Sequence, residues 1–174
     1  SEKREAFFTA FRLGGTAHGG IGMEKLTMTD ADFANLARIL RKVDFFTPLT
    51  VGQLDSVLPY IMLCRYSKGE AVFKQGDAGD AFYIIYEGKV SVSLKKGFFS
   101  FAKQVAALKS GDFFGEMALL ARDARSATVA CEEDSRLFVL LSTDFQSVVL
   151  QNPSFAAEVG KIAERRKFMS SHND

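Results

Sequence analysis

Cysteine, histidine and tryptophan are scarce in this sequence, which contains two cysteines, two histidines and no tryptophan. Cys64 and Cys131 are too few for a disulfide framework or a structural zinc site, so we expect packed thiols in a reducing compartment. His18 and His172 lie near opposite ends of the chain, which argues against a histidine-ligated metal enzyme. The net charge of +1 gives no overall electrostatic footprint for nucleic acid.

Long apolar runs are also missing. The longest apolar stretches, such as residues 57–63 and 137–141, are far short of the about 18 residues that a membrane helix needs. The N-terminal residues lack the apolar region of a signal peptide, so we expect a cytoplasmic protein without a membrane segment. The first residue, Ser1, is compatible with a processed terminus and with an excised fragment. The sequence contains no Walker loop, Rossmann fingerprint or nucleophile elbow.

The 174 residues, of which 47% are hydrophobic and 25% charged, suit one globular domain with an extension. Residues 2–12 have the apolar spacing of a short helix. Residues 14–22 include five glycines and are interpreted as a flexible linker. We therefore predict an N-terminal helix and linker over 1–28, followed by one domain over 29–174.

Helical signals occupy residues 29–61. Thr29 and Asp32 have the spacing of a capping box, in which two side chains satisfy backbone N–H groups at a helix start, and Thr50 with Gln53 forms a second one. Apolar residues with helical spacing follow each box. The segment is expected to form helices that pack beside the rest of the domain.

Short β-rich runs alternate with glycine turns across residues 63–141. In one of them, Val90, Val92 and Leu94 alternate with polar residues, which is typical of a strand with one buried and one wet face. Several short strands at this spacing predict a small barrel or jelly roll. The expected strands are 63–67, 71–75, 81–87, 89–96, 103–108, 127–131 and 136–141.

Helical spacing returns over residues 142–169. We expect Ser142 to cap a first helix, and Asn152 followed by Pro153 is a strong start signal for a second. Gly160 lies inside that last helix at a cost of about 1 kcal/mol relative to alanine, as a packing contact or as a soft point. The predicted fold is α+β: a small antiparallel jelly-roll barrel flanked by N-terminal helices and two C-terminal helices.

One segment carries a recognisable chemistry. Gly115 and Glu116 precede a short helical turn, and Arg125 follows before a strand. Free N–H groups at a short helix start attract an anion. An arginine offers forked donors to phosphate oxygens, and a carboxylate suits a sugar hydroxyl. The pattern therefore favours a small sugar phosphate as ligand.

This segment resembles the phosphate-binding cassette of the cyclic nucleotide-binding domain family, and the nine-residue spacing from Glu116 to Arg125 is kept. The resemblance extends to residues 68–70, 75–80 and 83–88 and covers about residues 30–169. The matching cassette residues are Gly115, Glu116, Ala118, Leu119, Arg125, Ser126 and Ala127.

The resemblance implies a role for each matching residue. Glu116 would accept a hydrogen bond from the ribose 2′-hydroxyl. Arg125 would pair with the cyclic phosphate, with help from backbone N–H groups of Ala118 and Ser126. The alternative is a domain that has lost its ligand, in which Arg125 is only a surface salt-bridge partner of Glu116.

The base would be held by residues outside this segment as well. By resemblance, Val92, Ala106 and Leu108 would wall the base, or else belong simply to the core. Gly115 and Met117 would line the sugar and base side.

The last helix would close over the base as a lid in this family. Arg166 falls where related channel modules place a base-contacting arginine, with Phe168 as an alternative. A solvated basic helix end is the competing interpretation, since a helix C-terminus favours cations.

The resemblance implies a non-catalytic sensor or regulatory domain that binds cyclic AMP, or else cyclic GMP, with no metal or cofactor. Ser126 favours cyclic AMP, since threonine at this position favours cyclic GMP in some members. A homodimer or an effector domain, joined through the terminal helices, is the expected protein partner, without direct binding of nucleic acid. The alternative is the ligand-binding part of a catabolite-activator-like transcription regulator whose DNA-binding domain is not in this chain. A cupin-type barrel enzyme conflicts with the scarcity of histidine.

Overall fold

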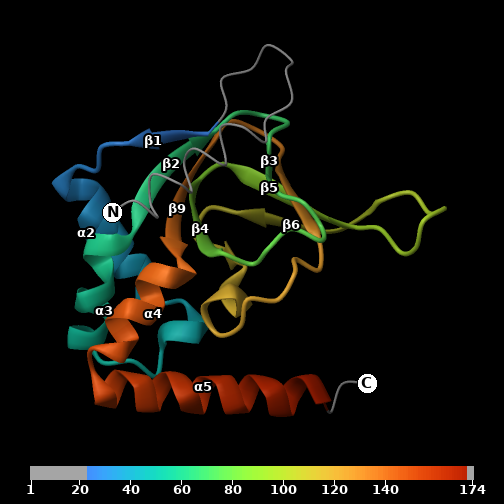
Figure 1. Cartoon of the computed structure of the whole chain (residues 1–174). Coiled ribbons are helices and arrows are strands. Elements are labelled where there is room, and N and C mark those ends of the chain that lie inside the picture. The colour runs from blue at the N-terminus through green and yellow to red at the C-terminus, as the bar shows by residue number, and fades with distance from the viewer. Residues whose placement is uncertain (1–22, 172–174) are drawn as a thin grey trace.

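The computed structural model describes the backbone of residues 23–171 and the side chains of residues 23–165 (Figure 1). The predicted helix over 2–12 and the glycine-rich linker lie outside the described residues. Within these limits, two antiparallel β-sheets form a jelly roll, and helices pack against one side of it (Figure 1). This arrangement confirms the predicted fold class.

The nine strands of the described residues divide between the two sheets. The five-stranded sheet has the order β1 (Glu24–Leu26), β2 (Met62–Tyr66), β9 (Ser135–Leu141), β4 (Ala81–Glu87) and β7 (Phe113–Phe114). The four-stranded sheet has the order β3 (Ala71–Phe73), β8 (Thr128–Cys131), β5 (Lys89–Leu94) and β6 (Lys103–Lys109). Strands β2 to β6, β8 and β9 match the seven predicted runs to within two residues at either end. Strands β1 and β7 were not predicted.

The five-stranded sheet separates two hydrophobic cores. Successive residues of a strand point to opposite faces, and along β4 and β9 both faces are buried. One face contacts the helices and the other faces the jelly-roll interior. The helix-side residues include Phe82, Ile84, Phe138 and Leu140, whereas Ala81, Tyr83, Ile85, Leu137, Val139 and Leu141 face the interior.

The helical elements begin where the sequence indicates. Both predicted capping boxes are present, at Thr29 with Asp32 and at Thr50 with Gln53. The prediction that Ser142 caps a helix is wrong, because Leu141 is the cap residue and Ser142 is the buried first helical residue. The elements are α2 (Asp30–Leu40), η1 (Asp44–Phe46), α3 (Val51–Val57), η2 (Leu58–Tyr60), η3 (Glu116–Leu119), α4 (Ser142–Leu150) and α5 (Pro153–Ser171).

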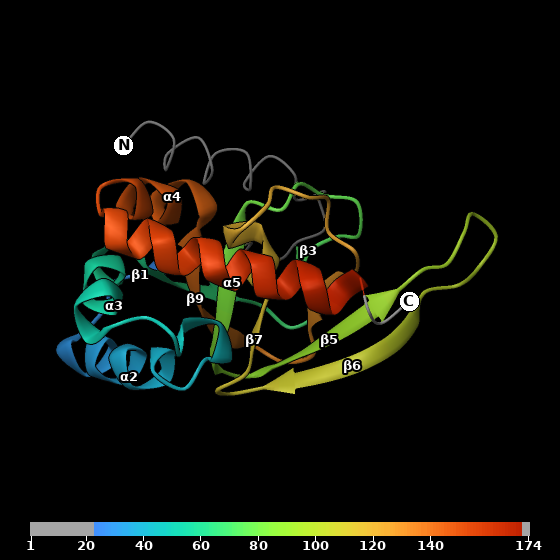
Figure 2. The ribbon, with the colours of Figure 1, turned by 90° about the horizontal axis from the view of Figure 1, so that it is seen from below.

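Helix α5 is capped by Asn152, whose Oδ1 accepts hydrogen bonds from the N–H groups of Ser154 and Phe155 at 3.1 and 3.2 Å. Phe155 is fully buried and meets Phe145 of α4 edge to face. Figure 2 shows α5 running from α4 across the molecule. A Cβ atom on Gly160 would meet no atom within 4 Å, so this glycine is not a packing contact.

Candidate cyclic nucleotide-binding site

A left-handed glycine begins the cassette. Gly115 has φ +75° and precedes the short helix η3. A Cβ atom at this position would lie 2.8 Å from Arg125 Nη1 and 3.2 Å from the Ala81 carbonyl oxygen. Both the backbone conformation and the close approach therefore require glycine.

Arg125 lies inside the site and not on its surface, with 8% of the residue exposed. Its Nη2 donates to the Ala81 carbonyl at 2.5 Å, and its guanidinium lies 4.1 Å from the centre of the Phe73 ring. Tyr83 lies further below, at 5.8 Å. Burial raises the pKa of Tyr83, so that hydroxyl remains neutral beneath the cation.

The charge of Arg125 is incompletely neutralised in the described structure. The carboxylate paired with it belongs to Asp80, whose Oδ1 lies 3.7 Å from Nη2 and whose side chain is half exposed. Nε of Arg125 is buried and has no hydrogen-bond partner among the described residues. A buried guanidinium with a distant counter-ion and a spare donor is suited to an anionic ligand. The interpretation of Arg125 as a surface ion-pair residue is therefore wrong.

Backbone hydrogen bonds hold the cassette loop against the segment before β4. The Arg125 N–H donates to the Asp77 carbonyl at 2.7 Å, and the Gly76 N–H donates back to the Arg125 carbonyl at 2.8 Å. Gly79 donates to the Asp123 carbonyl at 3.1 Å, and a Cβ atom on Gly79 would lie 2.4 Å from that oxygen. The loop is thus positioned by main chain, and Gly79 is a requirement that sequence reasoning missed.

The remaining cassette residues differ in their exposure. Glu116 is partly buried in the first turn of η3, Met117 is 42% exposed, and Ser126 is exposed. Ala118 is buried and its N–H donates to the Gly115 carbonyl at 3.2 Å. To bind a ligand phosphate, the Ala118 N–H would have to give up this hydrogen bond to the Gly115 carbonyl.

The three predicted base-wall residues meet on strands β5 and β6. Val92 pairs with Ala106 in register, and Leu108 lies two residues further along β6 on the same face as Ala106. Val92 and Leu108 are partly buried against the jelly-roll core, whereas Ala106 is exposed. Arg166 belongs to α5, but its side chain lies outside the described residues, so its predicted contact remains a prediction.

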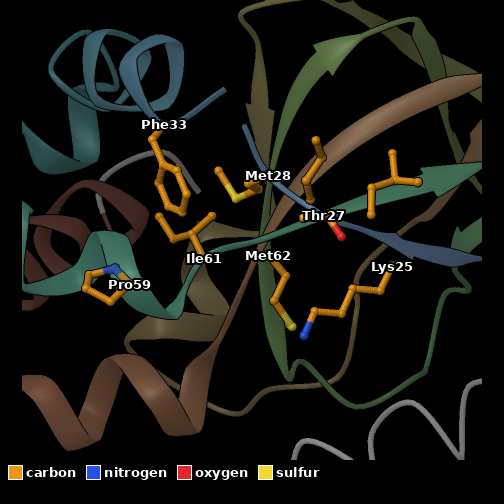
Figure 3. Close-up of a pocket in the computed structure, with 9 residues that line it drawn as sticks. Lys25, Thr27, Met28, Phe33, Pro59, Ile61 and Met62 are labelled. Carbon is orange, nitrogen blue, oxygen red and sulfur yellow. The ribbon is translucent and has the colours of Figure 1, made fainter. Parts of the chain in front are cut away.

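A separate cavity of about 370 Å³ lies away from the cassette, between α2 and the β1–β2 edge (Figure 3). Phe33, Met28 and Ile61 converge on it in Figure 3. Its opening leaves Phe33 40% exposed, although the sequence places this residue on the apolar stripe of its helix. The cavity was not foreseen, because β1 was not predicted.

The described part of the chain contains neither a candidate metal-binding cluster nor a membrane-spanning helix. Residues 23–171 contain no group of three or more histidine, cysteine or acidic side chains placed to hold a metal ion. In the same range, no helix is both long enough and apolar enough to cross a membrane.

Comparison with known proteins identifies the class. The profile of the Cyclic nucleotide-binding domain matches residues 63–152, more than half of the chain. The chain therefore belongs to the cyclic nucleotide-binding domain family. This residue range contains the cassette, strands β3 to β9 and all of β2 except its first residue.

Individual relatives include a protein kinase and a receptor protein. A cGMP-dependent protein kinase of Toxoplasma gondii is 35% identical over 106 residues, which are 61% of this chain and 10% of the kinase. The Cyclic AMP receptor protein of Thermus thermophilus is 31% identical over 121 residues, which are 70% of this chain and 56% of the receptor. The chain thus spans only part of these relatives.

A solved structure supports the fold alone. The N-terminal domain of a transcriptional regulator from Streptomyces coelicolor superposes with a TM-score of 0.68 at 23% identity. The superposition covers 78% of this chain and 94% of that domain.

Proposed function

We propose that this chain is a non-catalytic sensor of a cyclic nucleotide. The observation that carries the proposal is the buried guanidinium of Arg125, whose Nε has no partner among the described residues and whose carboxylate neighbour, Asp80, lies 3.7 Å away. An incoming cyclic phosphate would supply the missing negative charge through charge-assisted hydrogen bonds. The site offers hydrogen bonds and charge, and the proposal includes no reaction step.

Each cassette residue has a role in this proposal. Arg125 exchanges its hydrogen bond to the Ala81 carbonyl for the phosphate oxygens. The N–H groups of Ala118 and Ser126 add donors, and Glu116 accepts from the ribose 2′-hydroxyl. Gly115 keeps the main chain close enough for these groups to converge, since a side chain there would displace the guanidinium.

Cyclic AMP is the proposed ligand in preference to cyclic GMP. Ser126, directly after the cassette arginine, supports this choice by resemblance, and the receptor from Thermus thermophilus bears cyclic AMP in its name. The base would lie along Val92, Ala106 and Leu108, which share one face of β5 and β6. The relative from Toxoplasma gondii is named for cyclic GMP, so both nucleotides belong in the test.

The output of binding would pass through helix α5. Closure of this helix over the base, with Arg166 as a contact, would give the bound state an interaction that the free state lacks. A domain over residues 29–174 would thus transmit the signal to a homodimer partner or an effector domain through its terminal helices. A cytoplasmic location is part of this proposal and agrees with the buried, unpaired thiols of Cys64 and Cys131.

Isothermal titration calorimetry with cyclic AMP and cyclic GMP tests the proposal. We expect Arg125→Ala to weaken binding about 30- to 1000-fold, which corresponds to about 2–4 kcal/mol. Arg122→Ala is the matched control, because Arg122 lies exposed in the same loop. Arg125→Lys keeps the charge and should retain part of the affinity, which separates loss of contact from loss of fold. Unchanged affinity in a folded Arg125→Ala protein would contradict the assignment.

A second candidate is the ligand-binding part of a catabolite-activator-like regulator. The similarity to the Thermus thermophilus receptor, of which the chain spans 56%, favours it. The gene distinguishes the two candidates: a helix-turn-helix segment encoded after residue 174 would support the regulator, and its absence would exclude it.

A further inference from the structure

The hairpin formed by β5 and β6 projects from the body of the molecule and ends in a loop over residues 95–102 (Figures 1 and 2). This loop contains three phenylalanines, Phe98, Phe99 and Phe101, which are 95%, 102% and 96% exposed. Apolar side chains grouped in this way on a surface mark a contact with another molecule or with a membrane. Nothing in the cassette or in the proposed nucleotide binding uses them.

The same hairpin concentrates positive charge. Residues 88–111 contain five lysines and no acidic residue, although the whole chain carries a net charge of only +1. Lys95, Lys96 and Lys103 flank the three phenylalanines. None of these three lysines has a carboxylate within ion-pair distance among the described residues. The tip therefore combines an apolar apex with a basic collar.

The base of this loop is firmly held. Gln75 accepts a hydrogen bond from the Lys95 N–H at 2.9 Å and donates to the Lys95 carbonyl at 3.1 Å. The strand ladder ends at the pair of Leu94 and Lys103. The ladder holds the two strands together up to the loop, and Gln75 ties Lys95 to the segment before β4. The three phenylalanines belong to neither hydrophobic core.

We propose that this hairpin tip docks on an anionic lipid bilayer. The three phenylalanines enter the boundary between headgroups and acyl chains, while Lys95, Lys96 and Lys103 remain level with the anionic headgroups. The phenylalanines at the end of the loop reach the acyl chains, and the lysines behind them reach the anionic headgroups, which is the arrangement expected of a protein segment bound at a membrane surface. A projecting tip with its rings at the apex offers no groove to hold a peptide or a nucleic acid strand. The proposal does not rest on nucleotide binding.

Co-sedimentation of the full chain with phosphatidylcholine vesicles, with and without about 30% phosphatidylserine, tests this proposal. We expect binding only to the anionic vesicles. The combined change Phe98→Ser, Phe99→Ser and Phe101→Ser should abolish it, whereas Leu150→Ser, at an equally apolar residue that is 81% exposed on α4, should not. Replacing Lys95, Lys96 and Lys103 by glutamine should weaken binding about fivefold for each lysine. The same change at the exposed residues Lys42, Lys68 and Lys161 is the charge-matched control.

The absence of tryptophan allows a second readout that reports insertion directly. In Phe99→Trp, the single indole should shift its emission to the blue and become shielded from an aqueous quencher when anionic vesicles are added. Leu150→Trp should show neither effect. If the wild-type chain does not bind anionic vesicles, the proposal is wrong. Phenylalanine-dependent self-association, or phenylalanine-dependent binding to single-stranded DNA, without any binding to vesicles would also overturn it.

Discussion

At the scale of single residues, the environment of Arg125 differs most from what the sequence indicates. The motif predicts an arginine that faces a phosphate, and the structure places that arginine over Phe73, with no partner for its Nε in the part of the chain that the structure describes. The identity of Phe73 as its neighbour arises from packing between β3 and the cassette, which no local pattern encodes. The sequence pattern points to Arg125 and Gly115, but it could not predict that Arg125 packs on the Phe73 ring.

The prediction of packed thiols is confirmed, because Cys64 and Cys131 are both free and buried. Burial raises the pKa of Cys64 to about 12 and that of Cys131 to about 11. A thiol with such a pKa is almost entirely protonated at neutral pH and is a poor nucleophile. The sequence predicted packed thiols, and their burial in the jelly-roll core accounts for the raised pKa values.

Glu116 can be tested with a double-mutant cycle that uses 2′-deoxy cyclic AMP. Glu116→Gln should weaken binding of cyclic AMP, because an acceptor-only carboxylate becomes an amide of mixed character. The 2′-deoxy ligand should bind the wild type poorly and lose less further affinity in the variant. Losses that simply add, measured by calorimetry, would mean that Glu116 does not contact the 2′-hydroxyl.

At the scale of elements, the local signals were strongest where a helix begins. Two capping boxes and the Asn152 cap were predicted from side-chain chemistry alone and are present. Strands β1 and β7 escaped prediction because they are three and two residues long and exist only through pairing with β2 and β4. A period of two cannot be recognised over so few residues.

Helix α5 provides a test of the proposed output. It is anchored near its start by Phe155 and at Ile162, whereas Glu164 and Arg165 are exposed. An end with few anchors opens easily, so amides over residues 160–169 should gain hydrogen-exchange protection when cyclic AMP saturates the protein. Truncation after Gly160 should weaken binding by about 1–2 kcal/mol. Tight binding with unchanged exchange would show that α5 is not the lid.

Gly160 is predicted to be a soft point of this helix. Since a Cβ atom there meets open space, Gly160→Ala should stabilise α5 by about 0.5–1 kcal/mol. The midpoint of thermal unfolding, Tm, should then rise by about 2–4 °C for each kcal/mol of added stability. Ala157→Gly, at an exposed position of the same helix, should have the opposite effect. A fall in Tm for Gly160→Ala would reveal a contact that requires glycine.

At the scale of the whole molecule, an ionic cluster joins the helical side to the five-stranded sheet. Arg136 of β9 donates through Nε to Glu87 of β4 at 2.8 Å and lies 4.0 Å from Asp32 of α2. Its guanidinium also lies 4.7 Å from the Tyr86 ring centre. Hydrogen bonds from Thr29 lower the pKa of Asp32, and the hydrogen bond from Arg136 lowers that of Glu87.

Stability should therefore decrease in acid. A carboxyl whose pKa is lowered by folding contributes fully above its ordinary pKa, and this contribution is lost as the pH falls through the lowered folded value. We expect a constant Tm between about pH 7 and 5 and a decline below about pH 4.5. Asp80 has the opposite effect on the pH dependence of stability, because burial raises its pKa.

Circular dichroism melts from neutral to acidic pH measure this dependence. Glu87→Gln should lower Tm at neutral pH and flatten the acid decline, because the variant has no carboxylate left to protonate at this position. Asp55→Asn, at an exposed carboxylate of α3, should leave the decline unchanged. An identical acid decline in Glu87→Gln would assign the pH dependence to other groups.

The two-sided sheet between the cores also constrains how this sequence can change over generations. Adjacent positions of β4, such as Tyr83 and Ile84, belong to different cores. A larger side chain at position 83 requires smaller neighbours in the jelly-roll core, because that core is densely packed. A larger side chain at position 84 requires smaller neighbours in the core between the sheet and the helices. Neighbours in the chain are therefore expected to drift independently, while residues far apart in sequence but on the same face change together.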